Sequence, residues 1–314
     1  MNNFPQNNSL RCLWTTVAGG NFGDNLNSLL WRTLLAEIGP VRPCQAVYGV
    51  GSFHGIAIPK KTKILHVMGS GCAGRSRISS AVGKGVHFHF VRGPRTAEAW
   101  NCGAGVLADG AVLLAHTYLG NLAPERRAES VGYVPHHISD QLADYEYICR
   151  QAGVRYIGSK GYDTEGFVRK LKSCDYVITE ALHGAIVADL FRIPWLAVSS
   201  RRHINAYKWN DWCQSVGLEY KPYEINFVCS RGLRTSDRLL NAIKRAVAAI
   251  GLGKNKWKQK KICYDGRTEE DLVAEQIVMI KKRADYLLSA TPVRNQMIEQ
   301  TGEILRAFKK EVAV

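Results

Sequence analysis

Short apolar segments alternate with helix-forming segments along most of the chain, and few folds are compatible with such alternation. Strand patterns in the first half lie at 12–17, 47–50, 64–68, 87–91 and 105–114. Strand patterns in the second half lie at 131–134, 154–158, 175–178 and 194–198. Helix patterns separate them at 25–38, 94–100, 140–152, 164–172 and 185–191. Strands joined through helices run parallel, so the sequence predicts a parallel sheet in each half.

The chain has 314 residues, which is more than one ordinary core holds, so two domains are expected. The polar stretch 120–130 is the best linker between them. We predict an N-terminal Rossmann-like domain over 1–126 and a second Rossmann-like domain over 127–250. A basic linker and C-terminal helices over 251–314 are expected to pack back on the first domain. Two such domains facing a cleft describe a GT-B-like α/β architecture.

Two apolar stripes at helical spacing occur near the C-terminus. The members of the first stripe are Val273, Ile277, Ile280, Ala284 and Leu287. The members of the second stripe, in a helix opened by Thr291-Pro292, are Met297, Thr301, Leu305 and Phe308. Stripes of this kind are typical of packing faces rather than of binding sites.

The net charge of +15 indicates an anionic partner, for which nucleic acid, a phosphorylated small molecule and an anionic membrane surface all qualify. Part of the excess is local, because 254–261 contains five lysines around Trp257. Lysines beside an aromatic ring suit a bilayer surface, although a solvated linker is the alternative. No apolar run is long enough to span a membrane, and the N-terminus lacks a signal-peptide pattern. We expect a cytoplasmic protein that can attach peripherally to the inner face of the cytoplasmic membrane.

Nine cysteines without a zinc-type pair fit a reducing compartment. The spacing of the other metal-ligating residue types predicts no metal site, and no cofactor is expected.

The segment Thr179–Gly184 lies between a strand pattern and a helix pattern, and it contains His183. The histidine is therefore predicted at a helix N-terminus, beside the carboxyl end of a parallel strand, where open α/β sheets bind ligands. Amide N–H groups and the helix dipole attract anions there, and a histidine can move a proton near neutral pH. The alternative is a loop histidine that hydrogen-bonds a backbone carbonyl.

Two further strand ends of the first half carry candidate site residues. Asp24 follows Gly19-Gly20-Asn21-Phe22-Gly23 at the start of a helix, where it either caps the helix or faces the cleft. Arg92 ends the strand at 87–91, and arginine binds carboxylate or phosphate through two parallel hydrogen bonds. A surface ion pair is the alternative for Arg92.

The strand ends of the second half carry histidines and cations. His136 and His137 follow the strand at 131–134, and no third ligand is spaced to make them a metal site. Arg201 and Arg202 follow the strand at 194–198 and would complete an anion pocket beside His183. Trp209 and Trp212 come soon after, where they either stack on a sugar ring or belong to the core.

Taken together, these motifs resemble the polysaccharide pyruvyltransferase family, in particular enzymes of bacterial exopolysaccharide assembly. The motifs that carry the resemblance, in family order, are Asn21–Asp24, Val91–Thr96, Asp109–Ala111, Gly132–His137, Leu182–Gly184, Ala188-Asp189, Ile193-Pro194 and Lys208–Trp212. The resemblance implies a GT-B-like fold and phosphoenolpyruvate as the donor substrate. It also implies a pyruvate ketal installed across two hydroxyls of a sugar, often on a lipid-linked oligosaccharide.

The resemblance matches His183 to the family's cleft histidine and Arg92 to its donor-binding arginine, and the chemistry of the residues predicts the other roles. His183 would be the catalytic acid, and Asp24 or His136 would be the base toward the acceptor. The donor-binding residues expected are Arg92, Arg95, Gly184, Arg201 and Arg202. The acceptor-binding residues expected are Asn21, Asp24, His137, Lys208 and Trp209. Some relatives carry an arginine where this chain has Ala181, so one phosphate contact is missing unless Arg201 or Arg202 replaces it.

Two other functions remain open at this point. A nucleotide-sugar-dependent glycosyltransferase shares the architecture, but we find no compelling carboxylate for a ribose in the second half. A non-catalytic binder of nucleic acid or of an anionic glycan would suit the charge. The sequence contains no recognised nucleic-acid-binding module, so a nucleic-acid partner is not expected.

Overall fold

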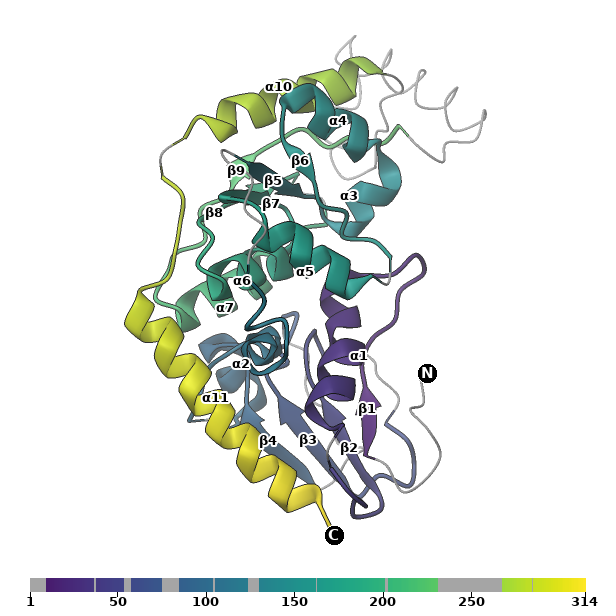
Figure 1. Cartoon of the computed structure of the whole chain (residues 1–314). Helices are drawn as coiled ribbons and strands as arrows, with labels where there is room; N and C mark the ends of the chain where they lie inside the picture. Colours follow the sequence, from purple (N-terminus) through teal and green to yellow (C-terminus); the bar gives the residue numbers. More distant parts are fainter. Residues whose placement is uncertain are drawn as a thin grey trace.

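The computed structural model describes residues 10–36, 38–53, 58–74, 85–103, 105–123, 130–161, 163–200, 203–230, 267–283 and 285–314. It contains two parallel β-sheets with helices packed around them (Figure 1). Arg201, Arg202, most of the predicted linker and the lysine-rich segment 254–261 lie outside the described residues. None of the described helices has the length and apolar character needed to cross a bilayer.

The first sheet has the strand order β1-β2-β3-β4, and every pairing in it is parallel. Its strands are β1 (Arg11–Leu13), β2 (Gln45–Tyr48), β3 (Ile64–Met68) and β4 (Val86–Phe90). Two helices accompany it, α1 (Phe22–Leu34) and α2 (Pro94–Trp100). Four of the strands predicted for the first half are confirmed here, although β1 is shorter than expected and β2 begins two residues earlier than expected.

The second sheet has the order β6-β5-β7-β8-β9 and is also parallel throughout. Its strands are β5 (Val131–Val134), β6 (Arg155–Tyr156), β7 (Tyr176–Thr179), β8 (Trp195–Ser199) and β9 (Tyr223–Glu224). Its helices are α3 (His137–Leu142), α4 (Tyr145–Ala152), α5 (Thr164–Lys172), α6 (Leu182–Leu190) and α7 (Ala206–Ser215). The α/β class with parallel sheets is therefore confirmed.

Two sequence predictions are wrong in this region. The helix predicted over 140–152 is broken into α3 and α4, because Asp144 caps a new helix by accepting a hydrogen bond from the Tyr147 amide at 3.2 Å. The short buried strand predicted within 105–114 is only an isolated bridge at Leu107, and a 3₁₀ helix, η2 (Gly110–His116), follows it. The Asp109 carboxylate starts η2 by accepting from the Ala111 amide at 2.9 Å.

The C-terminal helices bury the apolar stripes seen in the sequence. Helix α10 (Arg267–Lys281) buries Val273, Ile277 and Ile280, and it lies beside α4 in Figure 1. Helix α11 (Thr291–Val312) buries Thr301, Leu305 and Phe308, and it runs along the first sheet to the C-terminus in Figure 1. Leu287 departs from the predicted helical stripe, because α10 ends at Lys281 and Leu287 pairs with Trp195 in an antiparallel bridge.

The two halves share one apolar core. Buried Leu26 and Leu30 of α1 belong to the same cluster as Phe167 of α5 and Trp195 of β8. The rings of Phe22 and Phe167 stack with their centroids 3.4 Å apart. Since α1 follows the first strand and α5 precedes β7, this contact fixes the carboxyl ends of the two sheets close to each other.

Candidate active site

The carboxyl ends of strands from both sheets open on one cavity with about 730 Å³ of empty space. The ionisable residues that line it are Asp24, Arg92, His136, His137, Glu180, His183, His203 and Lys208. Each follows a strand directly or begins the helix after it, which is the position that the sequence predicted for a site.

His183 lies in the first turn of α6, as the sequence predicts, and Ala181 is the residue that precedes the helix. Its ring packs against Gly23, where an added Cβ would overlap the Nδ1 atom. The Nε2 atom lies 3.7 Å from Asp109 Oδ1. Within the described residues, His183 Nε2 and Asp109 Oδ2 are both buried without a hydrogen-bond partner. These atoms are therefore available to a ligand or to a small rearrangement.

Burial and nearby charges shift the protonation of this group of residues. Burial lowers the pKa of His183 to about 4, and Asp24 opposes this shift while Arg92 and Lys208 add to it. Burial raises the pKa of Asp109 to about 6 against the opposing effect of Arg92. Burial also raises the pKa of Asp24. Burial therefore favours the neutral form of the His183 imidazole and the protonated form of the two carboxyl groups.

Asp24 faces the cavity and does not cap α1. The cap is Asn21, whose side chain accepts a hydrogen bond from the Gly23 amide at 3.3 Å. The Asn21 amide group also donates to Asp24 Oδ2 at 2.8 Å. Asp24 Oδ1 leaves no room for a Cβ at Gly51, whose φ of +115° lies in the region that favours glycine. The sequence predicted that Asp24 either caps the helix or faces the cleft, and the capping alternative is wrong.

Arg92 forms a buried ion pair, with only 1 % of its surface exposed. Its Nε donates to Asp211 Oδ2 at 3.0 Å, and its Nη2 donates to the Cys72 carbonyl at 2.5 Å. The third nitrogen, Nη1, has only a long contact of 3.5 Å to the Ser52 hydroxyl. Two of the three guanidinium nitrogens therefore donate to the protein itself rather than to a ligand. Arg92 lines the cavity, and Nη1 is the nitrogen that remains for a ligand there.

Two predicted site residues do not line the cavity, and a third lines it but is almost completely buried. Arg95 does not line it; its Nε donates to Gln214 at 3.1 Å and its guanidinium lies over the Tyr207 ring. Gly184 is buried, and its amide donates to the Ala181 carbonyl at 2.9 Å. Trp209 lines the cavity but is 2 % exposed and stacks on Tyr220, so its ring face is occupied by the core.

His136 cannot serve as the predicted base in this conformation. Its Nδ1 accepts a hydrogen bond from the Ile138 amide at 3.3 Å, so the proton of the neutral ring is on Nε2, which can only donate. Burial and the neighbouring His137, His203 and Lys208 lower its pKa to about 2. Its ring centroid lies 4.3 Å from that of His137 and 4.7 Å from that of His203.

The Lys208 side chain lines the cavity, and its ammonium group has no hydrogen bond or ion pair within the part of the chain that the structure describes. Burial, followed by the charge of Arg92, lowers its pKa. It lies on α7 and lines the same cavity as Ala181. The sequence predicted Lys208 as an acceptor contact, and the structure places it in the cavity that Ala181, Leu182 and His183 also line.

Sequence reasoning missed the roles of Asp109, Glu180 and His203. Glu180 is fully buried and accepts hydrogen bonds from the Tyr133 and Tyr145 hydroxyls, both at 3.0 Å, from the His136 amide at 3.1 Å and from the Ser139 hydroxyl. His203 Nε2 lies 2.6 Å from the Ser139 hydroxyl oxygen. Asp109 belongs to the motif Asp109–Ala111, and Glu180 belongs to the segment Thr179–Gly184 that contains His183. Their positions in these segments could have identified them as candidate site residues.

Comparison with known proteins shows the family to which the chain belongs. Residues 17–202 match the model of the polysaccharide pyruvyl transferase family, which is more than half of the chain, and the chain therefore belongs to this family. A curated relative is the succinoglycan biosynthesis protein ExoV of Rhizobium meliloti (strain 1021). It is 36% identical over 208 residues, which are 66% of this chain and 65% of the relative. The match thus spans just under two thirds of the relative's length.

Proposed function

We propose that this protein transfers the pyruvyl carbons of phosphoenolpyruvate to two hydroxyls of a sugar in an exopolysaccharide repeat unit, forming a pyruvate ketal. The observation that carries the proposal is His183 at the N-terminus of α6, which lines the cavity together with Lys208 and lies 3.7 Å from the buried Asp109. Membership of the pyruvyl transferase family supports the same reaction class. A lipid-linked oligosaccharide as the acceptor is part of the proposal.

The donor would bind at the N-terminus of α6. Within the described part of the chain, the amides of Leu182 and His183 donate no hydrogen bond, and both residues line the cavity. These amides and the positive end of the helix dipole suit the phosphate. Lys208 and the remaining Nη1 of Arg92 supply charge for the carboxylate. Phosphoenolpyruvate carries a phosphate and a carboxylate, and these positive groups would balance their negative charges.

The chemistry requires a proton on carbon and two hydroxyl additions. Protonation of the donor methylene gives an oxocarbenium-like centre at C2, to which one sugar hydroxyl adds. The C2–O bond to phosphate then breaks, and a second hydroxyl closes the ketal. The two hydroxyls release two protons. One of them returns to the acid that protonated the methylene carbon, and the other leaves with phosphate. General acid–base help in such steps is worth about 10²–10⁴-fold.

His183 is the proposed acid, and binding of the donor would raise its pKa so that the imidazole carries the proton. The cations Arg92 and Lys208 help to keep its pKa low in the free protein. A bound phosphate and carboxylate would offset both cations, so the imidazole would gain a proton that Asp109, 3.7 Å away, stabilises. Asp24, on the α1 side of the cavity and with a raised pKa, is the proposed base toward the sugar hydroxyl.

The test compares wild-type protein with His183→Gln on a lipid-linked oligosaccharide. With phosphoenolpyruvate, the wild type should add the mass of pyruvate minus water, as read by mass spectrometry, and nucleotide sugars should give no product. His183→Gln should bind the donor in calorimetry and melt normally, yet lose turnover by about 10²-fold or more. Near-normal turnover of this variant would contradict the acid role, and product from a nucleotide sugar would contradict the donor assignment.

The GT-B-like division into domains at about 126 and 250 is part of the same proposal. It is supported by the two parallel sheets whose carboxyl ends share the cavity. The C-terminal helix then belongs with the first half, since α11 contacts η2 and the first sheet.

A further inference from the structure

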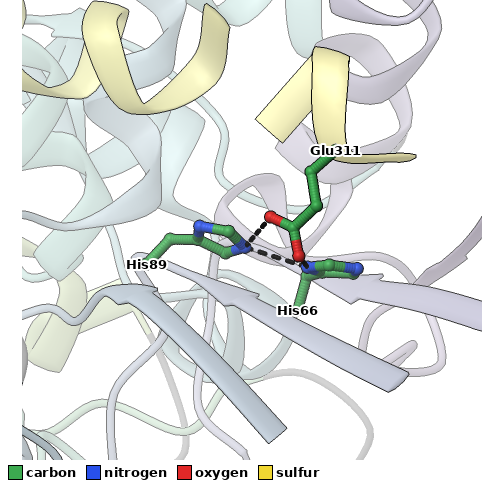
Figure 2. Close-up of side chains that lie close together, drawn as sticks. All are labelled: His66, His89 and Glu311. Atoms are coloured by element: carbon green, nitrogen blue, oxygen red, sulfur yellow. Dashed lines mark hydrogen bonds and ion pairs between the residues drawn. The ribbon is translucent and has the colours of Figure 1, made fainter. Parts of the chain in front are cut away.

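Three potential metal ligands lie together far from the cavity, at the contact between α11 and the first sheet. His66 comes from β3, His89 from β4 and Glu311 from the last turn of α11. Figure 2 shows the three side chains pointing toward one another. His66 Nδ1 lies 2.9 Å from His89 Nε2, and the Glu311 oxygens lie 4.0 Å from His66 Nδ1 and 3.9 Å from His89 Nε2. Among the described residues, this is the one group with such ligand geometry.

The groups around the cluster orient its ligand atoms. His66 is fully buried, and its Nε2 lies 2.7 Å from Gln45 Oε1. The carbonyl oxygen of Gln45 can only accept, so the proton of His66 is on Nε2 and the Nδ1 lone pair faces His89 and Glu311. His87 Nδ1 lies 3.0 Å from a Glu311 oxygen and holds the carboxylate. Outer hydrogen bonds of this kind typically fix the ligands of a metal ion.

We propose that His66 Nδ1, His89 Nε2 and the Glu311 carboxylate bind one divalent transition-metal ion, Zn²⁺ in the first instance, with solvent as a fourth ligand. Metal–ligand distances of about 2.0–2.2 Å in a tetrahedron require ligand atoms about 3.4 Å apart. The 2.9 Å between the two histidine nitrogens is within about 0.6 Å of that value. So are the 4.0 Å from His66 Nδ1 to Glu311 Oε1 and the 3.9 Å from His89 Nε2 to the other carboxylate oxygen, Oε2, so the carboxylate has to turn to present one oxygen to the ion.

The donor atoms favour Zn²⁺ over Mg²⁺ or Ca²⁺. Two imidazole nitrogens and one carboxylate form a set that suits Zn²⁺ and its neighbours in the first transition row, whereas the hard cations prefer oxygen alone. The ring of Phe308 lies 5.1 Å from that of His66 and 5.4 Å from that of His89, so one side of the cluster is apolar. The other side is open, because the side chains of His87 and Glu311 are 46% and 38% exposed.

The site would act as a clamp on the C-terminal helix. None of its three ligands lines the cavity of the proposed reaction. Glu311 is the single ligand outside the two strands, so a bound ion would tie the last turn of α11 to β3 and β4. The same helix packs on η2, which begins directly after Asp109. The ion is therefore expected to stabilise the fold rather than to touch the substrates.

The experiment uses the full-length wild-type protein, stripped with EDTA and titrated with Zn²⁺ alone. We expect about one ion per chain and a rise of several degrees in the melting temperature. Glu311→Gln keeps the shape of a half-exposed side chain but removes the anionic ligand. It should weaken Zn²⁺ binding by more than about 100-fold, whereas loss of an outer partner in His87→Gln should cost about 10–100-fold.

Two further variants guard against misfolding and against metal bound elsewhere. His89→Gln should lose Zn²⁺ like Glu311→Gln, and both should keep the melting temperature of the metal-free wild type within a few degrees. His116→Gln, a histidine that faces α11 at Thr301, should bind Zn²⁺ normally. Absence of binding in the wild type would overturn the proposal, as would Zn²⁺ affinity that is unchanged in Glu311→Gln and His89→Gln. Neither result depends on phosphoenolpyruvate or on turnover.

Discussion

At the scale of single residues, the protonation of His183 responds to its neighbours. Burial lowers its pKa to about 4, Arg92 and Lys208 add to this shift, and a bound anion would offset the two cations. The pKa then rises, the donor complex takes up a proton, and donor affinity increases as the pH falls. Calorimetry near neutral pH in two buffers of different ionisation enthalpy should show this uptake. His183→Gln should take up less, and equal uptake in both proteins would contradict the prediction.

Gly23 is predicted to matter through the space that it leaves for His183. A Cβ at position 23 would overlap His183 Nδ1, so Gly23→Ala must displace the ring. Misplacement by about 1 Å can cost about 10²-fold in rate, and we expect turnover to fall by this amount. The melting temperature should change little, because alanine suits the helix. Gly39→Ala is the matched control, since a Cβ there meets no atom within 4 Å; similar kinetics for both variants would refute the steric argument.

Arg92 and Arg95 form a natural comparison of a buried and a partly exposed arginine. Arg92→Lys removes the hydrogen bonds to Asp211 and to the Cys72 carbonyl, and we expect it to lose about 1–3 kcal/mol of unfolding free energy. It should also impair use of the donor more than use of the acceptor. Arg95→Lys should be nearly neutral, because its partner Gln214 lies outside the cavity. Urea melts and kinetics with each substrate varied would check this, and equal effects of the two variants would contradict it.

At the scale of elements, Asn27 connects α1 to the loop that follows β2. Its side chain bonds both the N–H and the C=O of Val50, at 2.9 and 2.8 Å, and it is fully buried. Asn27→Ala would leave those two backbone groups unpaired, so we expect a loss of about 3 kcal/mol in chemical denaturation. Asn295→Ala, on the exposed side of α11, should stay within about 0.5 kcal/mol of wild type. If Asn27→Ala lost less than about 1 kcal/mol of unfolding free energy, or no more than Asn295→Ala loses, the result would contradict this account.

At the scale of the whole molecule, the net charge of +15 is expected to matter for the acceptor. The lysine-rich segment 254–261 lies outside the described residues, and its membrane role stays a prediction. Replacing its lysines with glutamine should weaken sedimentation with anionic vesicles, since each lysine contributes about 1 kcal/mol there. Turnover on a soluble acceptor should be unchanged. Unaltered vesicle binding would contradict this role and leave a solvated linker.

The order of strands and helices was predictable because it depends on local patterns. The apolar runs at 64–68 and 131–134 became β3 and β5 with the predicted bounds, and Pro94 began α2. The place of His183 in the first turn of α6 followed from the same reasoning, since a strand, a short turn and a helix are adjacent in the chain. Parallel strands align their carboxyl ends, so the sequence also located the region of the cavity.

The sequence by itself therefore determined the fold class and the edge of the sheets where the site lies. Only the tertiary structure decided which side chains face a ligand. Arg92 meets Asp211, 119 residues away, and His183 meets Asp109 across the two halves. Glu311 meets His66 and His89 only because α11 returns to the first sheet. Burial and hydrogen-bond partners set the pKa of each group, its tautomer and whether it is free to bind a ligand. Burial and partners depend in turn on contacts between residues that are distant in the chain.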